Sequence, residues 1–336
     1  MSDETVLVGI PEALESTKKA LMAVGWGESD AQVQAEIMVS AETCGNNQGL
    51  VKMFQPSLMA PAVGSASPVI EKETDTTALV NGMQSPGMLS LKTAVDLAVK
   101  KSEKGVASVG VYNTSTSSGQ LAWYAQRAAK EGRVVIIMAN SPEFVAAKAG
   151  ASATFGTNPL AFACPVEGRD PFVFDMSTAA IALFGVLTCK AKGEPLPENS
   201  AYDGNGNYTT NVADIAVGGG QGAIANWGGH KGVGIALMIE LLCAALVPAA
   251  ALGIVDAKKT AKSWGHLVIS IDPAATVDGF AQRAAAIINT VATSHPDGVR
   301  LPGDSSLAVA KTNEANGTLP VPKKIWDVIT KTAASA

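Results

Sequence analysis

The sequence predicts an α/β protein that is not a doubly wound nucleotide-binding fold. Short apolar segments typical of buried strands alternate with longer segments of helical periodicity along the 336 residues. Apolar residues make up 47% of the chain and charged residues 16%, which is enough for a sizeable core. No G-x-G-x-x-G motif follows a strand near the start, so the doubly wound fold has no direct support.

Two amphipathic helices are expected between residues 11 and 45. The first opens at residues 12–15, and Ser29 and Asp30 are expected to cap the second. Val33, Ile37 and Ala41 recur at helical spacing along that second segment. A stretch rich in Pro, Gly and Ser then predicts a link over residues 56–68.

The middle of the chain supplies the strands of the expected sheet. Strands are predicted at residues 78–82, 106–112, 134–139, 160–164, 172–174 and 266–272. Helices are predicted at residues 89–102, 120–131 and 277–293. The tail from 303 to 321 is polar and is expected to be irregular, before a last helix that begins at Lys323.

An apolar run from Val233 to Leu252 approaches the length of a membrane span. Glu240 interrupts the run, and Pro248 is expected to end its helix. We therefore predict a buried core helix at this place and no membrane partner.

Composition excludes several classes of function. The net charge is −5 and no basic run occurs, which argues against a nucleic-acid partner. The four cysteines are far apart and no His, Cys and carboxylate group has ligand spacing, so reduced thiols and no metal site are expected. The polar, acidic start has no signal-peptide core, and a cytoplasmic location follows as an expectation.

A glycine-rich motif at residues 228–232 precedes that apolar run. It reads Gly-Gly-His-Lys-Gly, and Lys231 therefore stands at a probable helix start. Glycines allow close approach of the backbone, a helix start offers free N–H groups, and the lysine adds a positive charge. The motif suits a phosphate or a carboxylate, and a plain turn before a helix is its alternative reading.

Five further segments accompany this motif in order along the chain. They are residues 140–142 (Asn-Ser-Pro), 156–159 (Gly-Thr-Asn-Pro), 175–179 (Asp-Met-Ser-Thr-Ala), 265–273 (from Gly-His to Ile-Asp-Pro) and 300–304 (Arg-Leu-Pro-Gly-Asp). Together the segments resemble the malate/L-lactate dehydrogenase family of the non-Rossmann type. That family also includes ureidoglycolate and sulfolactate dehydrogenases and cyclic-imino-acid reductases.

The resemblance implies a fold and an activity. It implies a nucleotide-binding domain on a large mixed or antiparallel sheet, over residues 76–275. It implies a helical domain for substrate and dimer contacts, built from residues 1–75 and 276–336, and a homodimer. Family members transfer a hydride between NADH or NADPH and C2 of a small 2-oxo, 2-hydroxy or 2-imino acid.

The resemblance also assigns roles to residues. Cofactor contacts fall on four segments, and on the cofactor loop at the glycine-rich motif. These residues are Ser141, Thr157, Asn158, Pro159, Asp175, Met176, Ser177, His230, Lys231, Pro302, Gly303 and Asp304. Lys148 and Arg169 lie near these segments and slightly favour NADPH over NADH.

The chain departs from the family where the catalytic histidines stand. Gln48 occupies the place of one family His, Lys52 that of a family Arg, and Thr116 or Ser117 that of a second His. The chain has three His residues and none precedes position 230. Reduction of a ketone needs a proton on the oxygen, which a His near neutral pKa usually supplies.

Three explanations remain open. In the first, Lys52 donates the proton, with its pKa lowered by burial and with Asp175 holding it in place. In the second, the substrate is an imine that already carries its proton, and a polar pocket of Asn47, Gln48, Thr116, Ser117 and Lys52 suffices. In the third, the protein has lost redox chemistry and serves as an isomerase, lyase or nucleotide-binding protein in the same cleft.

The run of five hydroxyl-bearing residues from Thr114 to Ser118 is itself open to two readings. With the N–H groups at the start of the following helix it could hold a carboxylate or phosphate. The alternative is a solvated capping loop.

Overall fold

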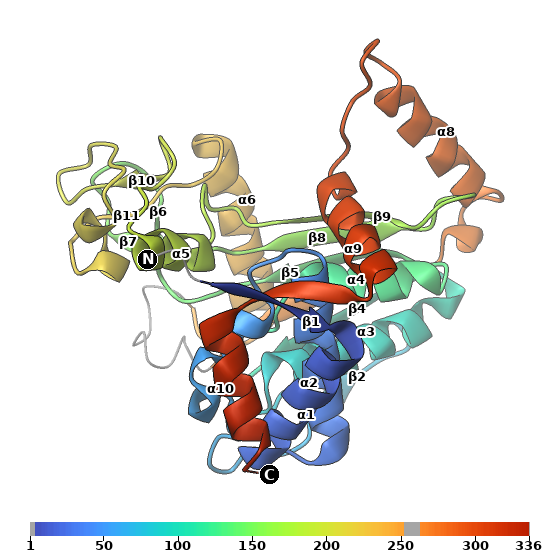
Figure 1. The fold of residues 1–336 in the computed structure, drawn as a ribbon. Coiled ribbons are helices and arrows are strands. Elements are labelled where there is room, and N and C mark those ends of the chain that lie inside the picture. The colour runs from blue at the N-terminus through green and yellow to red at the C-terminus, as the bar shows by residue number, and fades with distance from the viewer. Residues whose placement is uncertain (1–3, 252–262, 336) are drawn as a thin grey trace.

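A seven-stranded sheet forms the centre of the molecule (Figure 1). The computed structural model describes residues 4–251 and 263–335. β3 and β4 run parallel, and every other neighbouring pair in this sheet is antiparallel. In spatial order the strands are β2 (Val69–Glu73), β3 (Thr77–Asn81), β4 (Val106–Tyr112), β12 (His266–Ile271), β5 (Val134–Ala139), β8 (Leu160–Cys164) and β9 (Phe172–Met176). The mixed sheet confirms the predicted α/β class outside the doubly wound fold.

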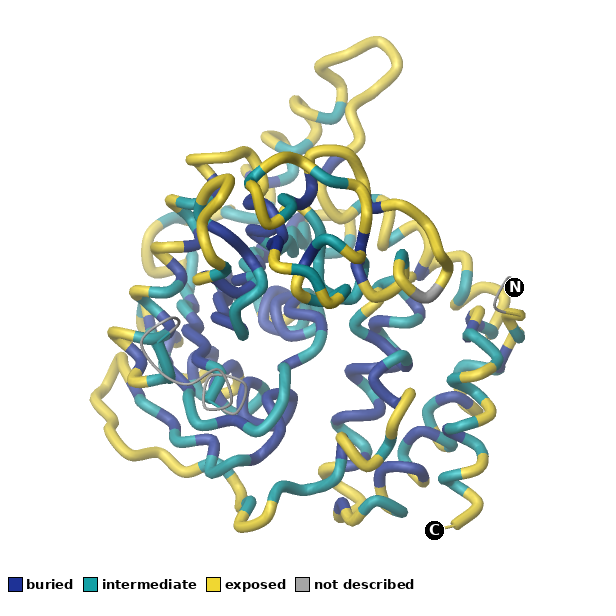
Figure 2. Tube along the Cα trace, turned by 90° about the vertical axis from the view of Figure 1, so that its left-hand side faces the viewer, coloured by how far each residue is buried: buried dark blue, intermediate teal, exposed yellow. Residues whose placement is uncertain are grey.

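Helices cover both faces of this sheet. α3 (Gly87–Lys101) and α4 (Leu121–Lys130) share one core with Val268 of β12, whereas α6 (His230–Glu240) packs against the neighbouring Leu267. Successive residues of a strand point to opposite faces, so α6 lies on the face opposite α3 and α4. In Figure 2 the dark blue, buried stretches of the chain lie mainly inside the molecule and the exposed ones mainly at its periphery.

The two chain ends meet in one helical unit. β1 (Thr5–Gly9) pairs antiparallel with β13 (Thr318–Pro322). α1 (Ile10–Ala23), α2 (Glu28–Thr43) and α10 (Lys323–Ala333) pack beside this pair (Figure 1). 3₁₀ turns at Leu50–Phe54 and Pro56–Met59 follow α2. The division of domains at residues 75 and 276 stays a prediction, and β2 pairs with the large sheet although it precedes residue 76.

A smaller lobe lies at one end of the large sheet (Figure 1). Its four short strands have the order β10 (Ala201–Tyr202), β11 (Ala223–Ile224), β6 (Val145–Ala146) and β7 (Ala153–Phe155). α5 (Leu183–Lys192) packs on this lobe with short 3₁₀ turns at Val212–Asp214 and Ala216–Gly218. Two further 3₁₀ turns, Ser102–Lys104 and Pro273–Ala275, flank β4 and β12.

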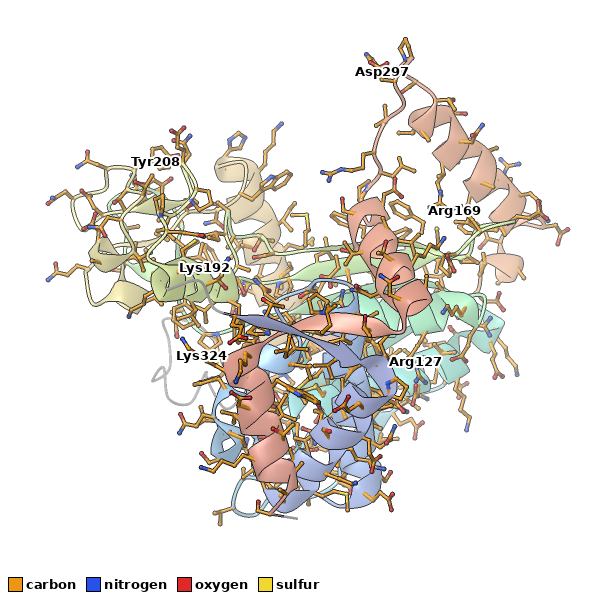
Figure 3. The ribbon with its side chains drawn as sticks, in the orientation of Figure 1. Arg127, Arg169, Lys192, Tyr208, Asp297 and Lys324 are labelled. Carbon is orange, nitrogen blue, oxygen red and sulfur yellow. The ribbon has the colours of Figure 1, made fainter. Side chains whose placement is uncertain are left out.

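An arm extends from the opposite end of the sheet. It carries α8 (Phe280–Ala292) and leads back into α9 (Asp304–Asn316), which lies over β9 (Figure 1). Most of the arm is exposed in Figure 2, and Figure 3 places Asp297 at its tip, far from the sheet.

The structure corrects three expectations. Residues 303–321 are not irregular, because they form α9 and β13. Ser29 and Asp30 do not cap α2, since the helix begins at Glu28 after an extended Gly27. α6 ends in a π-helical turn at Leu241–Leu246 before Pro248, but it is not wholly buried.

The apolar face of α6 is partly open to solvent. Leu237, Met238 and Leu241 are 47%, 42% and 56% exposed. Leu252, the expected end of the apolar run, lies outside the described residues. Within residues 4–251 and 263–335, no helix combines the length and the apolar character that a membrane crossing requires.

Candidate active site

Lys52 is the centre of the substrate-side cluster that the sequence predicted. It sits on the 3₁₀ turn after α2 and is 6% exposed. Its Nζ donates to Gln48 Oε1 at 2.9 Å and to Ser117 Oγ at 2.9 Å. The Thr116 hydroxyl donates to the Ser117 backbone oxygen at 3.4 Å. The structure therefore brings together residues that lie 65 positions apart in the sequence.

The Lys52 ammonium has only uncharged neighbours in these contacts. Its third contact is the ring of Phe184, whose centroid lies 4.8 Å from Nζ. Because burial removes the ammonium from water, the pKa of Lys52 is lowered to about 8. Lys52 forms no ion pair with a carboxylate within the described parts of the chain. This arrangement offers either a buried proton donor or a partner for one negative charge.

Glu42 fixes the turn that presents Gln48 and Lys52. Its Oε2 accepts from the Leu50 N–H at 2.8 Å, and burial raises the pKa of Glu42 to about 7. Gly49 permits this contact, because a Cβ there would collide with the Glu42 carboxylate and lie 2.9 Å from the Met38 carbonyl oxygen. No pattern in the sequence indicates this role for Glu42.

Asp175 lies on β9 and faces the start of α4. The Ala122 N–H donates to its Oδ2 at 2.9 Å. Burial raises the pKa of Asp175 to about 6, and the N–H groups of Ala122 and Leu121 oppose that rise. Asp175 and Lys52, both of which the structure describes, form no ion pair, so the expectation that Asp175 holds Lys52 is wrong. The carboxylate is bound instead by N–H groups in the first turn of α4, which have no hydrogen-bond partner within the helix.

A cavity of about 800 Å³ opens beside Asp175. Segments of α2, α4, β9 and α9 line it, and the predicted residues Pro302, Gly303 and Asp304 stand at its edge. Gly303 has a positive φ of 88°, and a side chain there would collide with the Val173 carbonyl oxygen. Arg169 and Asp304 face each other at 3.7 Å across this edge, with Arg169 visible beside the arm in Figure 3.

Three hydroxyl-bearing residues join the cofactor-side segments. Ser141 Oγ accepts from the Thr157 N–H at 2.8 Å, and Ser177 Oγ donates to the Thr157 carbonyl oxygen at 2.8 Å. The Pro159 carbonyl accepts from the Ala139 N–H at 3.1 Å. The ends of β5 and β9, including Met176, are thereby held against the loop before β8. Ser141, Thr157, Pro159, Met176 and Ser177 thus lie together as predicted.

Asn158 contacts α6 instead of facing outward. It is fully buried, and its Nδ2 donates to the Ala236 carbonyl oxygen at 3.2 Å and to Glu240 Oε2 at 3.0 Å. Asn140 Nδ2 donates to the other Glu240 oxygen at 3.2 Å. A direct cofactor contact by the Asn158 side chain stays a prediction, and its observed contacts hold α6 in place.

His230 and Lys231 form the first turn of α6. Gly228 and Gly229, both with positive φ, make the tight turn before the helix. Both side chains are exposed, which leaves the first N–H groups of the helix and the Lys231 ammonium accessible to an anion. Lys231 therefore lies at a helix start, as the motif predicted, and a contact with an anion there stays a prediction.

His266 lies within the large sheet. His266 is fully buried on β12, and burial lowers its pKa to about 3, so it is neutral at physiological pH. No group of three His, Cys, Asp or Glu side chains able to hold a metal occurs in the described part of the chain.

Comparison with known proteins decides the family. The family model described as malate/L-lactate dehydrogenase matches residues 8–330. The chain belongs to this family. The resemblance drawn from the sequence segments is confirmed, and the protein is an NAD(P)-dependent oxidoreductase.

Named relatives of this dehydrogenase-family member span nearly the whole chain. Malate/(S)-sulfolactate dehydrogenase of Methanothermus fervidus is 32% identical, over 94% of each chain. (2R)-3-sulfolactate dehydrogenase (NADP(+)) of Chromohalobacter salexigens is 31% identical, over 98% of each. The crystal structure of Δ1-piperideine-2-carboxylate reductase from Pseudomonas syringae pvar. tomato superposes with a TM-score of 0.86 at 28% identity, covering 97% of this chain and 99% of that one.

Phe184, like Glu42, is a residue of this site that the sequence did not reveal. It lies 132 positions beyond Lys52, in the first turn of α5 in the smaller lobe. No local motif surrounds it. Only the tertiary placement of the smaller lobe against the 3₁₀ turn brings its ring over the lysine.

Proposed function

We propose that the protein reduces a small 2-oxo or 2-imino carboxylate with NAD(P)H, and that Lys52 is its atypical proton donor. The observation that carries this proposal is the Lys52 ammonium, buried among Gln48, Ser117 and Phe184 without a carboxylate partner. The named relatives act on substrates of both kinds, since they include a sulfolactate dehydrogenase and a piperideine-carboxylate reductase. The bound nicotinamide supplies the hydride.

For a ketone substrate, Lys52 supplies the proton. With a pKa of about 8, the ammonium is mostly protonated at neutral pH and can donate to the carbonyl oxygen as it becomes a hydroxyl. Gln48 and Ser117 hold Nζ in place, and the Gln48 amide or the neighbouring Thr116 hydroxyl can orient the substrate. Lys52 then cannot also bind the substrate carboxylate.

For an imine substrate, no acid is needed. An iminium ion already has its positive charge at carbon and a proton on nitrogen. The ammonium of Lys52 is therefore available to bind the carboxylate. The uncharged hydrogen-bonding groups at Gln48, Thr116 and Ser117 suit that role. An imine reductase with little activity on ketones is therefore the second candidate function.

The cofactor is proposed to lie along the segments that the sequence singled out. Ser141, Thr157 and Ser177 would fix the loop against which the nicotinamide packs, and Lys231 would meet a phosphate at the start of α6. Pro302 to Asp304 would close over it. Lys148 and Arg169 slightly favour NADPH, although Arg169 now shares its charge with Asp304.

We also propose a cytoplasmic homodimer. All four cysteines are free thiols, as a reducing compartment requires. Ile287 and Val291 on α8 are 66% and 45% exposed, which is unusual for side chains on an arm that projects from the body. Ile287→Asp is expected to reduce the molar mass in solution from two copies to one; an unchanged mass would contradict this interface.

The deciding experiment separates the two substrate kinds. Oxidation of NADPH is followed with pyruvate alone near neutral pH, where Lys52 is protonated, and with pyruvate and methylamine at high pH, where the amine converts part of the oxo acid into an imine. Equal turnover in both assays supports Lys52 as the acid, and turnover only with amine supports the imine reductase. No turnover in either assay would reject small 2-oxo and 2-imino acids as substrates.

A further inference from the structure

Phe184 belongs to the substrate site and not to the core of its own lobe. α5 packs into that core through Val186, which is fully buried, and through Cys189. Each residue of an α-helix is rotated by about 100° from the one before it, so Phe184 and Val186 lie on nearly opposite sides of α5. The Phe184 side chain therefore points away from the core of the smaller lobe. There its ring centroid lies 4.8 Å from Lys52 Nζ.

The charge around Lys52 limits what can bind beside it. One ammonium neutralises one carboxylate, and the groups in contact with that ammonium are an amide, a hydroxyl and an aromatic ring. Within the described parts of the chain, no second cationic side chain hydrogen-bonds to Gln48, Ser117 or Lys52. A second negative charge on the substrate would be buried here without a partner, which is costly.

The Phe184 ring offers the opposite preference. A flat or apolar substituent next to a Lys-bound carboxylate can pack on the ring, and aromatic packing adds to the gain from apolar burial. The same ring stabilises the lysine cation through its negative face. Both effects favour a substrate with one charge and an apolar or cyclic side chain.

We propose that Phe184 is a specificity-determining residue that selects monoanionic 2-oxo or 2-imino acids with apolar or ring side chains and rejects dianionic ones. This inference rests on the form of the proposed function in which the Lys52 ammonium binds the substrate carboxylate and does not serve as the acid. The inference separates the substrates named for the relatives into two groups. Sulfolactate and malate carry two negative charges, whereas piperideine-2-carboxylate carries one carboxylate.

The test compares phenylpyruvate with oxaloacetate. Their binding to the protein with NADP+ is measured by calorimetry in the wild type, Phe184→Leu and Phe184→Arg. Leu187→Ala is the matched control, because Leu187 is exposed on the same helix. The wild type is expected to bind phenylpyruvate at least about tenfold more tightly.

The variants are expected to change that ratio in different ways. Phe184→Leu keeps an apolar side chain but removes the ring. The preference for phenylpyruvate over oxaloacetate should therefore fall to about threefold. Phe184→Arg adds a second cation and should invert the preference. Leu187→Ala should leave it unchanged.

Several results would overturn the inference. They are equal or tighter binding of oxaloacetate by the wild type, an unchanged ratio in both Phe184 variants, or binding of neither acid. If Phe184→Arg does not fold, Phe184→Leu still decides. NADPH oxidation measured in parallel separates the two proposals: selective binding without any reduction refutes the proposed activity alone, whereas reduction with a preference for oxaloacetate refutes the selectivity alone.

Discussion

The two sides of the candidate active site are built in different ways. On the cofactor side, Ser141, Thr157 and Ser177 bind backbone groups of neighbouring segments around one end of the sheet. On the substrate side, side chains from three distant segments converge on the single charge of Lys52. The first construction fixes backbone shape, and the second fixes the environment of one ionisable group. The two constructions can therefore change independently of each other.

The largest expected effect lies on the substrate side, with Lys52→Met. Loss of a positioned acid is expected to lower kcat/KM for a 2-oxo acid at least about 100-fold. Reduction of an imine should fall less, by about tenfold, because only the ion pair with the carboxylate is lost. NADPH oxidation with each substrate measures the split.

Lys52→Arg is the matched control for this charge. Arginine keeps a cation for the carboxylate but does not release its proton at neutral pH. It should restore imine reduction in part and ketone reduction hardly at all. Ketone turnover by Lys52→Met within a few-fold of the wild type would show that another group supplies the proton.

The same contrast explains what the sequence could predict of the fold. β4, β5 and β8 were predicted with the observed bounds, because each is a short, mostly apolar segment between turn signals. α9 was missed because it is mostly polar and buries Ala310 alone. β13 contains two prolines and pairs with β1 more than 300 positions earlier, so no local pattern announces it.

Prediction of the site followed the same rule. Gln48 and Lys52 are four positions apart on one turn, and Ser117 came from the family resemblance, so these residues were found. Phe184 and Glu42 were missed, because their roles depend on contacts that only the folded chain creates. Asp175 was found but given the wrong partner, since no sequence pattern shows that the start of α4 faces it.

On the cofactor side, Ser141→Ala tests whether backbone shape controls binding. The change removes the acceptor for the Thr157 N–H and leaves that group without its partner. We expect the KM for NADPH to rise about tenfold with little change in kcat, from the cost of about 1.4 kcal/mol for one lost hydrogen bond. Ser335→Ala, at the exposed end of α10, is the control. A change in kcat alone would place Ser141 in the chemistry instead.

Lys231→Gln tests the accessible helix start. Removing this charge should raise the KM for NADPH roughly threefold to tenfold at low salt, and less at high salt, because exposed charges are screened. Lys192→Gln is a matched exposed lysine on α5, labelled in Figure 3. An effect that is equal for both lysines, or independent of salt, would contradict a phosphate contact at Lys231.

The smallest expected effect concerns stability behind the substrate side. Burial raises the pKa of Glu42 from 4.5 to about 7, so the folded protein holds this proton more tightly than the unfolded chain. The resulting stabilisation is complete below pH 4.5 and is lost as the pH rises to about 7. Glu42→Gln keeps an acceptor for the Leu50 N–H without the ionised carboxylate.

We therefore expect Glu42→Gln to match the wild type near pH 4.5 and to exceed its free energy of unfolding at pH 8 by about 1 kcal/mol. Urea unfolding at the two pH values measures the difference. Glu36→Gln, on the same helix, should show no such dependence on pH. A variant less stable than the wild type at pH 8 would mean that the ionised carboxylate stabilises the 49–50 turn by more than its burial costs.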